Sequence, residues 1–228
     1  QIPFRLISKY ANPNVTDSKK LKELSVHLSK DYQPEILKVF FVVLEKSLQE
    51  KFPDKIICII YKYLTHLVNK NSFVDLIVPH LNILLSEFIV QNTIISKSDL
   101  ILRIDDEKSY IYKVFDVAQS FNDKRYACSS FIRALCEYRI YNAKTKKLEK
   151  PEFLEKIFVF LVNMLDKYNT ERLEGKSPDP LIKEALMHLF ETIAIPVMEH
   201  KSEKEIESVI KSYIVPELED NNNTKFRD

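Results

Sequence analysis

The sequence contains a single glycine among 228 residues, where average usage would give roughly sixteen. Glycine takes positive φ and allows close backbone approach more readily than any other residue. Its scarcity therefore disfavours tight β-hairpins, phosphate-binding loops and strand-to-helix nucleophile elbows. We expect a fold of helices joined by polar turns.

Cysteine is also scarce, with three residues at Cys58, Cys128 and Cys136. The number is odd, the spacing contains no Cys-x-x-Cys pair, and each cysteine lies in an apolar helical pattern. We therefore predict reduced thiols in the core, because free cysteine behaves as a small apolar residue. The lack of a disulfide framework is typical of a cytosolic or nuclear compartment.

Long apolar runs and an excess of one charge are both lacking. The longest apolar stretches, 56–61 and 157–162, are far shorter than a membrane crossing requires. Lys plus Arg total 34 and Asp plus Glu total 33, so a net charge of +1 gives no general attraction to nucleic acid or membranes. We expect a soluble chain that contacts neither directly. Residues 1–10 show no signal-peptide pattern, and Gln1 suggests a fragment.

Apolar residues recur at intervals of three and four along most of the chain, which is the period of an amphipathic helix. The first such stripe covers residues 34–51 and begins at Pro34, which the first turn of a helix tolerates. A second stripe begins after Pro53 and ends at the polar residues 69–71. These two stripes predict an antiparallel helical hairpin.

The same two-helix pattern recurs. First helices begin near residues 34, 73, 123 and 179, with steps of about 39, 50 and 56 residues, close to a HEAT or armadillo repeat with loop insertions. Their partners carry apolar stripes near 110–117, 154–164 and 206–214. We therefore predict an all-α fold, an α-solenoid of HEAT-type antiparallel helix pairs over residues 1–228. It would hold about four pairs, with partial repeats at both ends.

Three stretches interrupt this pattern, namely residues 91–107, 141–151 and 169–180. We interpret them as inserted loops, where local function is most expected. Pro79 and Pro216 lie inside apolar helical patterns, where a missing N–H would bend or end the helix. In the last predicted pair, Ser202 and Glu205 have the spacing of a capping box.

The segment 98–117 carries an acidic turn followed by Tyr-Ile and Phe-Asp pairs. These residues are Asp105, Asp106, Tyr110, Ile111, Phe115 and Asp116. With them the segment resembles a signature of the karyopherin-β nuclear transport receptors, although Glu107, Ser109 and Tyr112 depart from that pattern. Further segments are similar, in order, to the importin seven and importin eight branch of this family, namely residues 5–15, 76–81, 183–188 and 214–218.

This resemblance implies a superhelix of HEAT repeats that carries protein cargo through nuclear pores and shuttles between cytoplasm and nucleus. Expected partners are the cargo, nucleoporins and the Ran GTPase, which would regulate cargo binding and release. The principal Ran site of the family lies in amino-terminal repeats, so we expect this chain to be a central fragment with that site outside it. Two alternatives stay open: an export receptor for importin-α, which shares the acidic and Tyr-Ile pattern, and a HEAT-repeat scaffold for a multiprotein complex.

The acidic turn Asp105, Asp106 and Glu107 admits three interpretations. Acid–base catalysis is the least supported, because no nucleophile or metal partner lies nearby in the sequence. The second is N-capping of the helix that contains Tyr110, where carboxylates accept unpaired backbone N–H groups. The third is an acidic contact to basic cargo or to Ran.

The lysines Lys144, Lys146, Lys147 and Lys150 form a basic run in the stretch 141–151. The run has no interleaved aromatic residue for base stacking and no glycine. A solvated loop is therefore favoured over direct nucleic-acid binding. As a functional interpretation, we assign Lys144, Lys146 and Lys147 to partner binding.

The five histidines lie on separate helical segments without the spacing of a metal-binding or catalytic motif. We expect each to have a surface or core role, with no catalytic residues, no metal and no cofactor. The chain is accordingly expected not to be an enzyme. The histidines are His27, His66, His80, His188 and His200.

Overall fold

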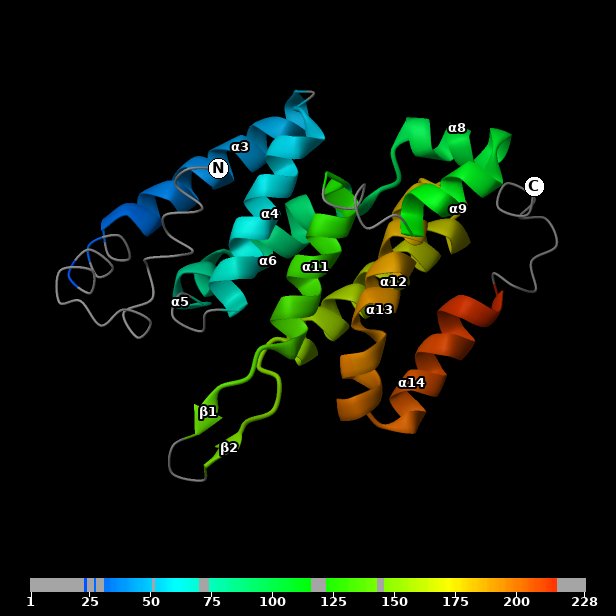
Figure 1. Cartoon of the computed structure of the whole chain (residues 1–228). Coiled ribbons are helices and arrows are strands. Elements are labelled where there is room, and N and C mark those ends of the chain that lie inside the picture. The colour runs from blue at the N-terminus through cyan, green and yellow to red at the C-terminus, as the bar shows by residue number, and fades with distance from the viewer. Residues whose placement is uncertain are drawn as a thin grey trace.

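The computed structural model describes residues 31–50, 52–69, 74–115, 122–142 and 146–216, together with Glu23 and His27. Helices account for most of these residues, which confirms the predicted all-α class. Figure 1 shows helices that follow one another across the molecule from α3 at one side to α14 at the other, except that α8 and α9 lie beyond α11, beside α12 and α13. The solenoid arrangement itself stays a prediction.

The elements of the first part of the chain are all helical, and their bounds are as follows. They are α3 (Gln33–Gln49), α4 (Asp54–Asn69), α5 (Val74–Ile77), the 3₁₀ helix η2 (Val78–His80), α6 (Leu81–Ile83), the π-helix η3 (Leu84–Ile89), α7 (Val90–Thr93), α8 (Lys97–Asp105), α9 (Glu107–Phe115) and α11 (Lys124–Glu137). The later elements are β1 (Tyr141–Asn142), β2 (Lys147–Leu148), α12 (Leu154–Leu173), α13 (Pro180–His200), α14 (Glu203–Val209) and the π-helix η4 (Ile210–Ile214).

Side-chain caps fix several helix starts. The Asp123 carboxylate accepts from the backbone N–H groups of Arg125 and Tyr126 at the start of α11. The predicted capping box is confirmed at α14, where the Ser202 hydroxyl accepts from the Glu205 N–H and the Glu205 carboxylate accepts from the Ser202 N–H. Hydrogen bonds from the Ser202 hydroxyl and N–H lower the pKa of Glu205 to about 2.

The single glycine ends a helix. Gly175 has φ of 78° directly after α12, a conformation that residues with a Cβ avoid. Its N–H donates to the Arg172 carbonyl, and the Lys176 N–H donates to the Glu171 carbonyl. This is the Schellman pattern, which satisfies the last carbonyls of the helix.

Prolines lie inside helical runs, as the sequence predicts, but with different effects. Pro79 falls in the 3₁₀ turn η2, which interrupts the helical run from Val74 to Thr93 because proline has no N–H to donate. Pro216 lies at the helical end of the last described segment. Pro196, which the sequence analysis did not single out, lies inside α13 without ending it.

A stretch of α5 to α8, Val74–Asp105, is long and apolar enough to cross a membrane by length and composition alone. The fold gives this hydrophobicity another explanation, because 44% of an apolar 18-residue window within the stretch is buried inside the protein. Leu84 and Ile89 are fully buried in the common core. The helical run is also interrupted between Thr93 and Lys97. We interpret its part from α5 to α7 as a core element, whereas α8 packs outside the core.

The core forms where four helical elements meet. Helix α11 packs against α4, α7 and α13, and it buries large side chains such as Phe131 and Leu135 completely. Across the interface with α4, the rings of Tyr61 and Phe131 lie 6.0 Å apart between centroids. Helix α12 packs chiefly against α13. Non-polar burial of this kind is the main favourable term in the stability of the fold.

Some helices pack against other partners than the sequence predicted. Residues 123–138 and 154–164 were expected to form one pair, but α11 contacts α4 and α13 more extensively than α12. The stretch 91–107, expected as an inserted loop, holds α8, which pairs with α9. The expectation failed because α8 buries none of its residues, so its apolar pattern did not mark it as a core helix.

The stretch 141–151 corrects a second expectation. Scarcity of glycine argued against β-hairpins, yet β1 and β2 form a short antiparallel ladder that pairs Tyr141 with Leu148 and Asn142 with Lys147. Lys146, directly before β2, takes a positive φ of 54°. A residue other than glycine can occupy this region at some cost in conformational energy. Figure 1 shows the hairpin projecting away from the helices.

Candidate partner-binding surfaces

The acidic turn joins α8 to α9. Asp105 ends α8, Glu107 begins α9, and Asp106 links them with φ of −148° and ψ of 78°. The Asp106 carboxylate accepts from the Ser109 N–H at 3.0 Å and from the Ser109 hydroxyl at 2.6 Å. These hydrogen bonds lower the pKa of Asp106. The N-capping interpretation is therefore confirmed for Asp106.

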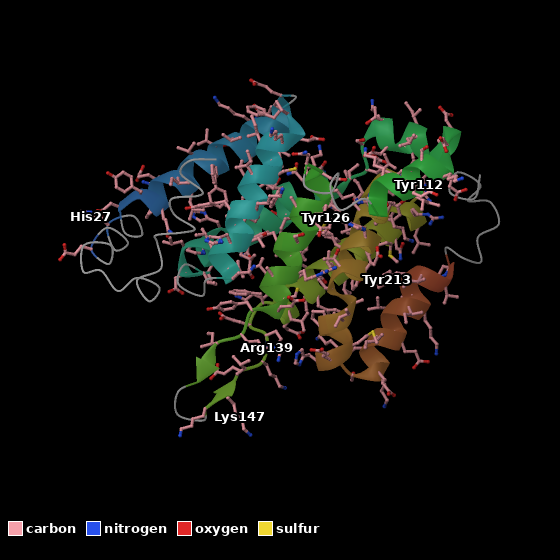
Figure 2. All side chains as sticks on the ribbon, viewed as in Figure 1. His27, Tyr112, Tyr126, Arg139, Lys147 and Tyr213 are labelled. Carbon is pink, nitrogen blue, oxygen red and sulfur yellow. The ribbon has the colours of Figure 1, made fainter. Side chains whose placement is uncertain are left out.

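Asp105 and Glu107 are exposed, as Asp106 is, and neither forms an ion pair with a described residue. Their surroundings are apolar as well as acidic. The α8–α9 hairpin exposes four large apolar side chains, with fractions between 46% and 66%: Ile101, Ile104, Ile111 and Tyr112. Figure 2 shows Tyr112 on this hairpin, at the edge of the molecule. Acidic and apolar groups side by side suit a protein partner.

The α8–α9 hairpin is held together by contacts between its own helices. Lys113 forms an ion pair with Asp99, and the Arg103 guanidinium lies 6.0 Å from the centre of the Tyr110 ring. Burial is the main cause that raises the pKa of Tyr110. The signature residue Tyr110 is thus half-buried inside the hairpin and supports its geometry.

The basic run lies on the projecting hairpin. Lys147, labelled in Figure 2, is in β2. Lys146 directly precedes it, and both are exposed. Lys144, which the sequence assigns to the same set, lies outside the described residues. Figure 1 places this hairpin and the α8–α9 hairpin at opposite ends of the molecule. The predicted acidic residues and the predicted basic residues therefore lie on two separate surfaces.

A polar cleft of about 790 Å³ was not foreseen from the sequence. It lies where α3 ends, α4 and α11 begin, and the chain passes from α7 to α8. An ion pair between Lys124 Nζ and Asp54 Oδ1, 3.3 Å apart, crosses it from α11 to α4. Acidic and basic side chains balance in its lining, which gives it no preference for one charge. Only folding brings these helix ends together, so periodicity could not reveal it.

The histidines occupy core and surface positions. The rings of His80 and Phe41 lie 4.4 Å apart between centroids, and His27 forms an exposed ion pair with Asp31. His188 Nε2 lies 3.0 Å from the Ser129 hydroxyl. Burial chiefly lowers the pKa of His188. Within the segments that the structure describes, no group of His, Cys, Asp and Glu has the arrangement of a metal site.

The three cysteines are free and buried, as predicted. Burial is the main cause that raises the pKa of Cys58 to about 11, and it raises the pKa of Cys128 and of Cys136 to about 12. Cys128 lies in a buried polar cluster, where Thr93 and Asn92 also bond to neighbours. These thiols pack the core and do not form reactive sites.

The chain is thus an all-α protein of packed helices that exposes charged and apolar surfaces. The chain is 26% identical over 167 residues to an importin beta-like SAD2 homolog of Arabidopsis thaliana. This similarity covers 73% of the chain and 15% of that relative's length. It supports the importin-β family resemblance, but not the particular branch. No family model and no solved structure matches the chain at a significant level.

Proposed function

We propose that the chain is a segment of a nuclear transport receptor of the karyopherin-β type. Such a receptor carries protein cargo through the nuclear pore, with binding and release regulated by Ran. The observation that carries this proposal is the similarity to an importin beta-like relative over 73% of the chain. The all-α fold supports it, because that family is expected to consist of helix pairs.

The finer parts of the proposal rest on the sequence resemblance. They are the importin seven and importin eight branch, a HEAT-type solenoid with this chain as a central fragment, contacts to nucleoporins, and shuttling between cytoplasm and nucleus. The proposal assigns no catalysis to the chain. Cargo would be held by extended surfaces such as the α8–α9 hairpin, where Asp105 and Glu107 lie beside exposed Ile101 and Ile104.

The contacts between helices suggest how binding at one place could be felt at another. Helix α11 packs against α4 on one side and α13 on the other. Small rotations at such interfaces add along an array in which each repeat contacts its neighbours. In the proposed mechanism, a partner bound at one end of the receptor changes curvature where the cargo lies.

The test uses the complete protein that contains this chain, immobilised with a basic cargo protein. Ran loaded with a non-hydrolysable GTP analogue is added, and Ran loaded with GDP is the matched control. Release of cargo by the GTP form alone supports an import receptor, and tighter retention supports an export receptor such as that of importin-α. Equal cargo binding in both arms would contradict the transport proposal and favour a scaffold.

A further inference from the structure

The hairpin of β1 and β2 is a fixed projection from the helices. Beyond its ladder, the Glu149 N–H donates to the Ile140 carbonyl at 2.9 Å, and the Glu152 N–H donates to the Tyr138 carbonyl at 3.4 Å. The rings of Tyr138 and Phe153 pack 5.6 Å apart at its base. The base is therefore anchored between α11 and α12, while β1 and β2 project away from the helices (Figure 1).

The charge of this projection is unbalanced. Residues 146–150 contain three lysines and one glutamate, a net charge of +2, in a chain whose total is +1, so all other residues sum to −1. Arg139 at the base is already paired with Glu199, at 3.3 Å between nitrogen and oxygen. Excess positive charge is therefore concentrated on the projecting part, where it attracts an acidic partner.

The lysines of the hairpin differ from many lysines on the helices. Lys113 and Lys124 each pair with a carboxylate of another helix, and Lys201, between α13 and α14, pairs with Glu155 of α12. By contrast, no residue in the described segments forms an ion pair with Lys146, Lys147 or Lys150, and all three are exposed. Their ammonium groups are available to a partner without breaking an ion pair among the described residues.

An apolar residue lies among these lysines. Leu148 in β2 is 60% exposed, directly follows Lys147 in the strand, and lies two residues before Lys150 in the chain. A leucine between lysines suits a polypeptide that carries an apolar residue among its Asp and Glu. A phosphate backbone offers no apolar group to cover it, and residues 146–150 contain no aromatic ring for stacking on bases and no arginine for two-pronged phosphate contacts.

We propose that Lys146, Lys147 and Lys150, with Leu148, form a docking surface for an acidic, extended segment of a partner protein. The carboxylates of that segment would contact the ammonium groups, and an apolar side chain would cover Leu148. This surface is distinct from the acidic α8–α9 hairpin. The docking proposal applies whether the chain is part of a transport receptor or of a scaffold, because this binding does not depend on Ran.

The experiment measures binding of a fluorescent peptide in which Asp and Glu alternate around a central leucine, with the whole chain titrated against it. The variant carries Lys146→Gln, Lys147→Gln and Lys150→Gln together. Its matched control carries Lys108→Gln, Lys156→Gln and Lys204→Gln, three exposed lysines of the helices. We expect the hairpin variant to bind roughly tenfold more weakly, and the control to bind as the wild type does.

Two further arms identify the class of partner. Leu148→Ser should weaken binding of this peptide about threefold, and leave unchanged the binding of a peptide with serine in place of the central leucine. A single-stranded oligonucleotide and vesicles containing phosphatidylserine are titrated in parallel. Undetectable peptide binding, equal binding by the hairpin variant, or tighter binding of the oligonucleotide or vesicles would overturn the proposal. Unchanged helical circular dichroism of each variant excludes unfolding as the cause.

Discussion

Arg125 on α11 and Glu184 on α13 form a two-pronged ion pair across the centre of the fold. Arg125 Nη1 lies 3.0 Å from Glu184 Oε2, and Arg125 Nη2 lies 2.6 Å from Glu184 Oε1. The side chains are only 16% and 20% exposed. Two parallel charge-assisted hydrogen bonds fix relative orientation as well as distance. The pair therefore sets how these two neighbouring helices align.

Removing one partner of this pair should destabilise the fold. We expect Arg125→Ala to lower the free energy of unfolding by about 1–3 kcal/mol, because Glu184 would keep a partly buried charge without its partner. Urea unfolding followed by circular dichroism measures the change. The control is Lys38→Ala, which removes an exposed pair with Glu35 and should cost about 0.5 kcal/mol or less. Equal effects of the two substitutions would show that the Arg125–Glu184 pair stabilises the fold no more than an exposed ion pair does.

A core substitution tests the packing of α11 against α4. Phe131 is fully buried, so Phe131→Ala should cost about 3–5 kcal/mol, from lost burial and the cavity that remains. Leu173 at the end of α12 is 89% exposed, and Leu173→Ala should change stability by about 0.5 kcal/mol or less. Thermal unfolding of the two variants provides the comparison. If Phe131→Ala were as mild as Leu173→Ala, the interface would be placed wrongly.

Lys201 connects α14 to α12 through two ion pairs. Its side chain is 8% exposed and its Nζ lies 2.5 Å from Glu155 Oε2 and 3.0 Å from Glu205 Oε1. Although burial opposes its charge, hydrogen bonds to both carboxylates raise the pKa of Lys201. Lys201→Met should release α14 from α12. Hydrogen exchange of amides in α14 is then expected to rise more than that of amides in α4, whereas a uniform rise would indicate a global effect.

We expect the partly buried His188 to make the stability of the fold depend on pH. Because burial chiefly lowers its folded pKa, the unfolded chain takes up a proton first as the pH falls below about 6.5, the ordinary histidine value. Stability contributed by the neutral form is thus present above that pH and is lost as the pH falls through the folded pKa. We expect the midpoint temperature of thermal unfolding to decrease as the pH is lowered from about 7.5 to about 5, and to decrease less in His188→Gln. Equal slopes would exclude this histidine as the cause.

Local signals in the sequence predicted a large part of the fold. Helix α4 follows from its apolar stripe, and the capping box from the spacing of Ser202 and Glu205. Buried cysteines and the capping role considered for the acidic turn were predicted as well. In each case the responsible residues lie within a few positions of one another, so the sequence displays the interaction directly.

Contacts between distant residues could not be predicted in this way. Arg125 and Glu184 are 59 residues apart, and no periodic pattern couples them. Helix α8 was missed because it packs outside the core. The hairpin was missed because Lys146 takes a backbone conformation that glycine usually supplies. The cleft arises only when helix ends from distant segments meet.

The central claim is that this chain belongs to a carrier that moves cargo into or out of the nucleus under the control of Ran. Its most direct test follows the complete protein and a fluorescent cargo in permeabilised cells supplied with Ran and GTP. The account predicts that cargo crosses the nuclear envelope only when the complete protein is added, and that removing Ran abolishes net transport. Equal distribution of cargo with and without the protein would contradict it.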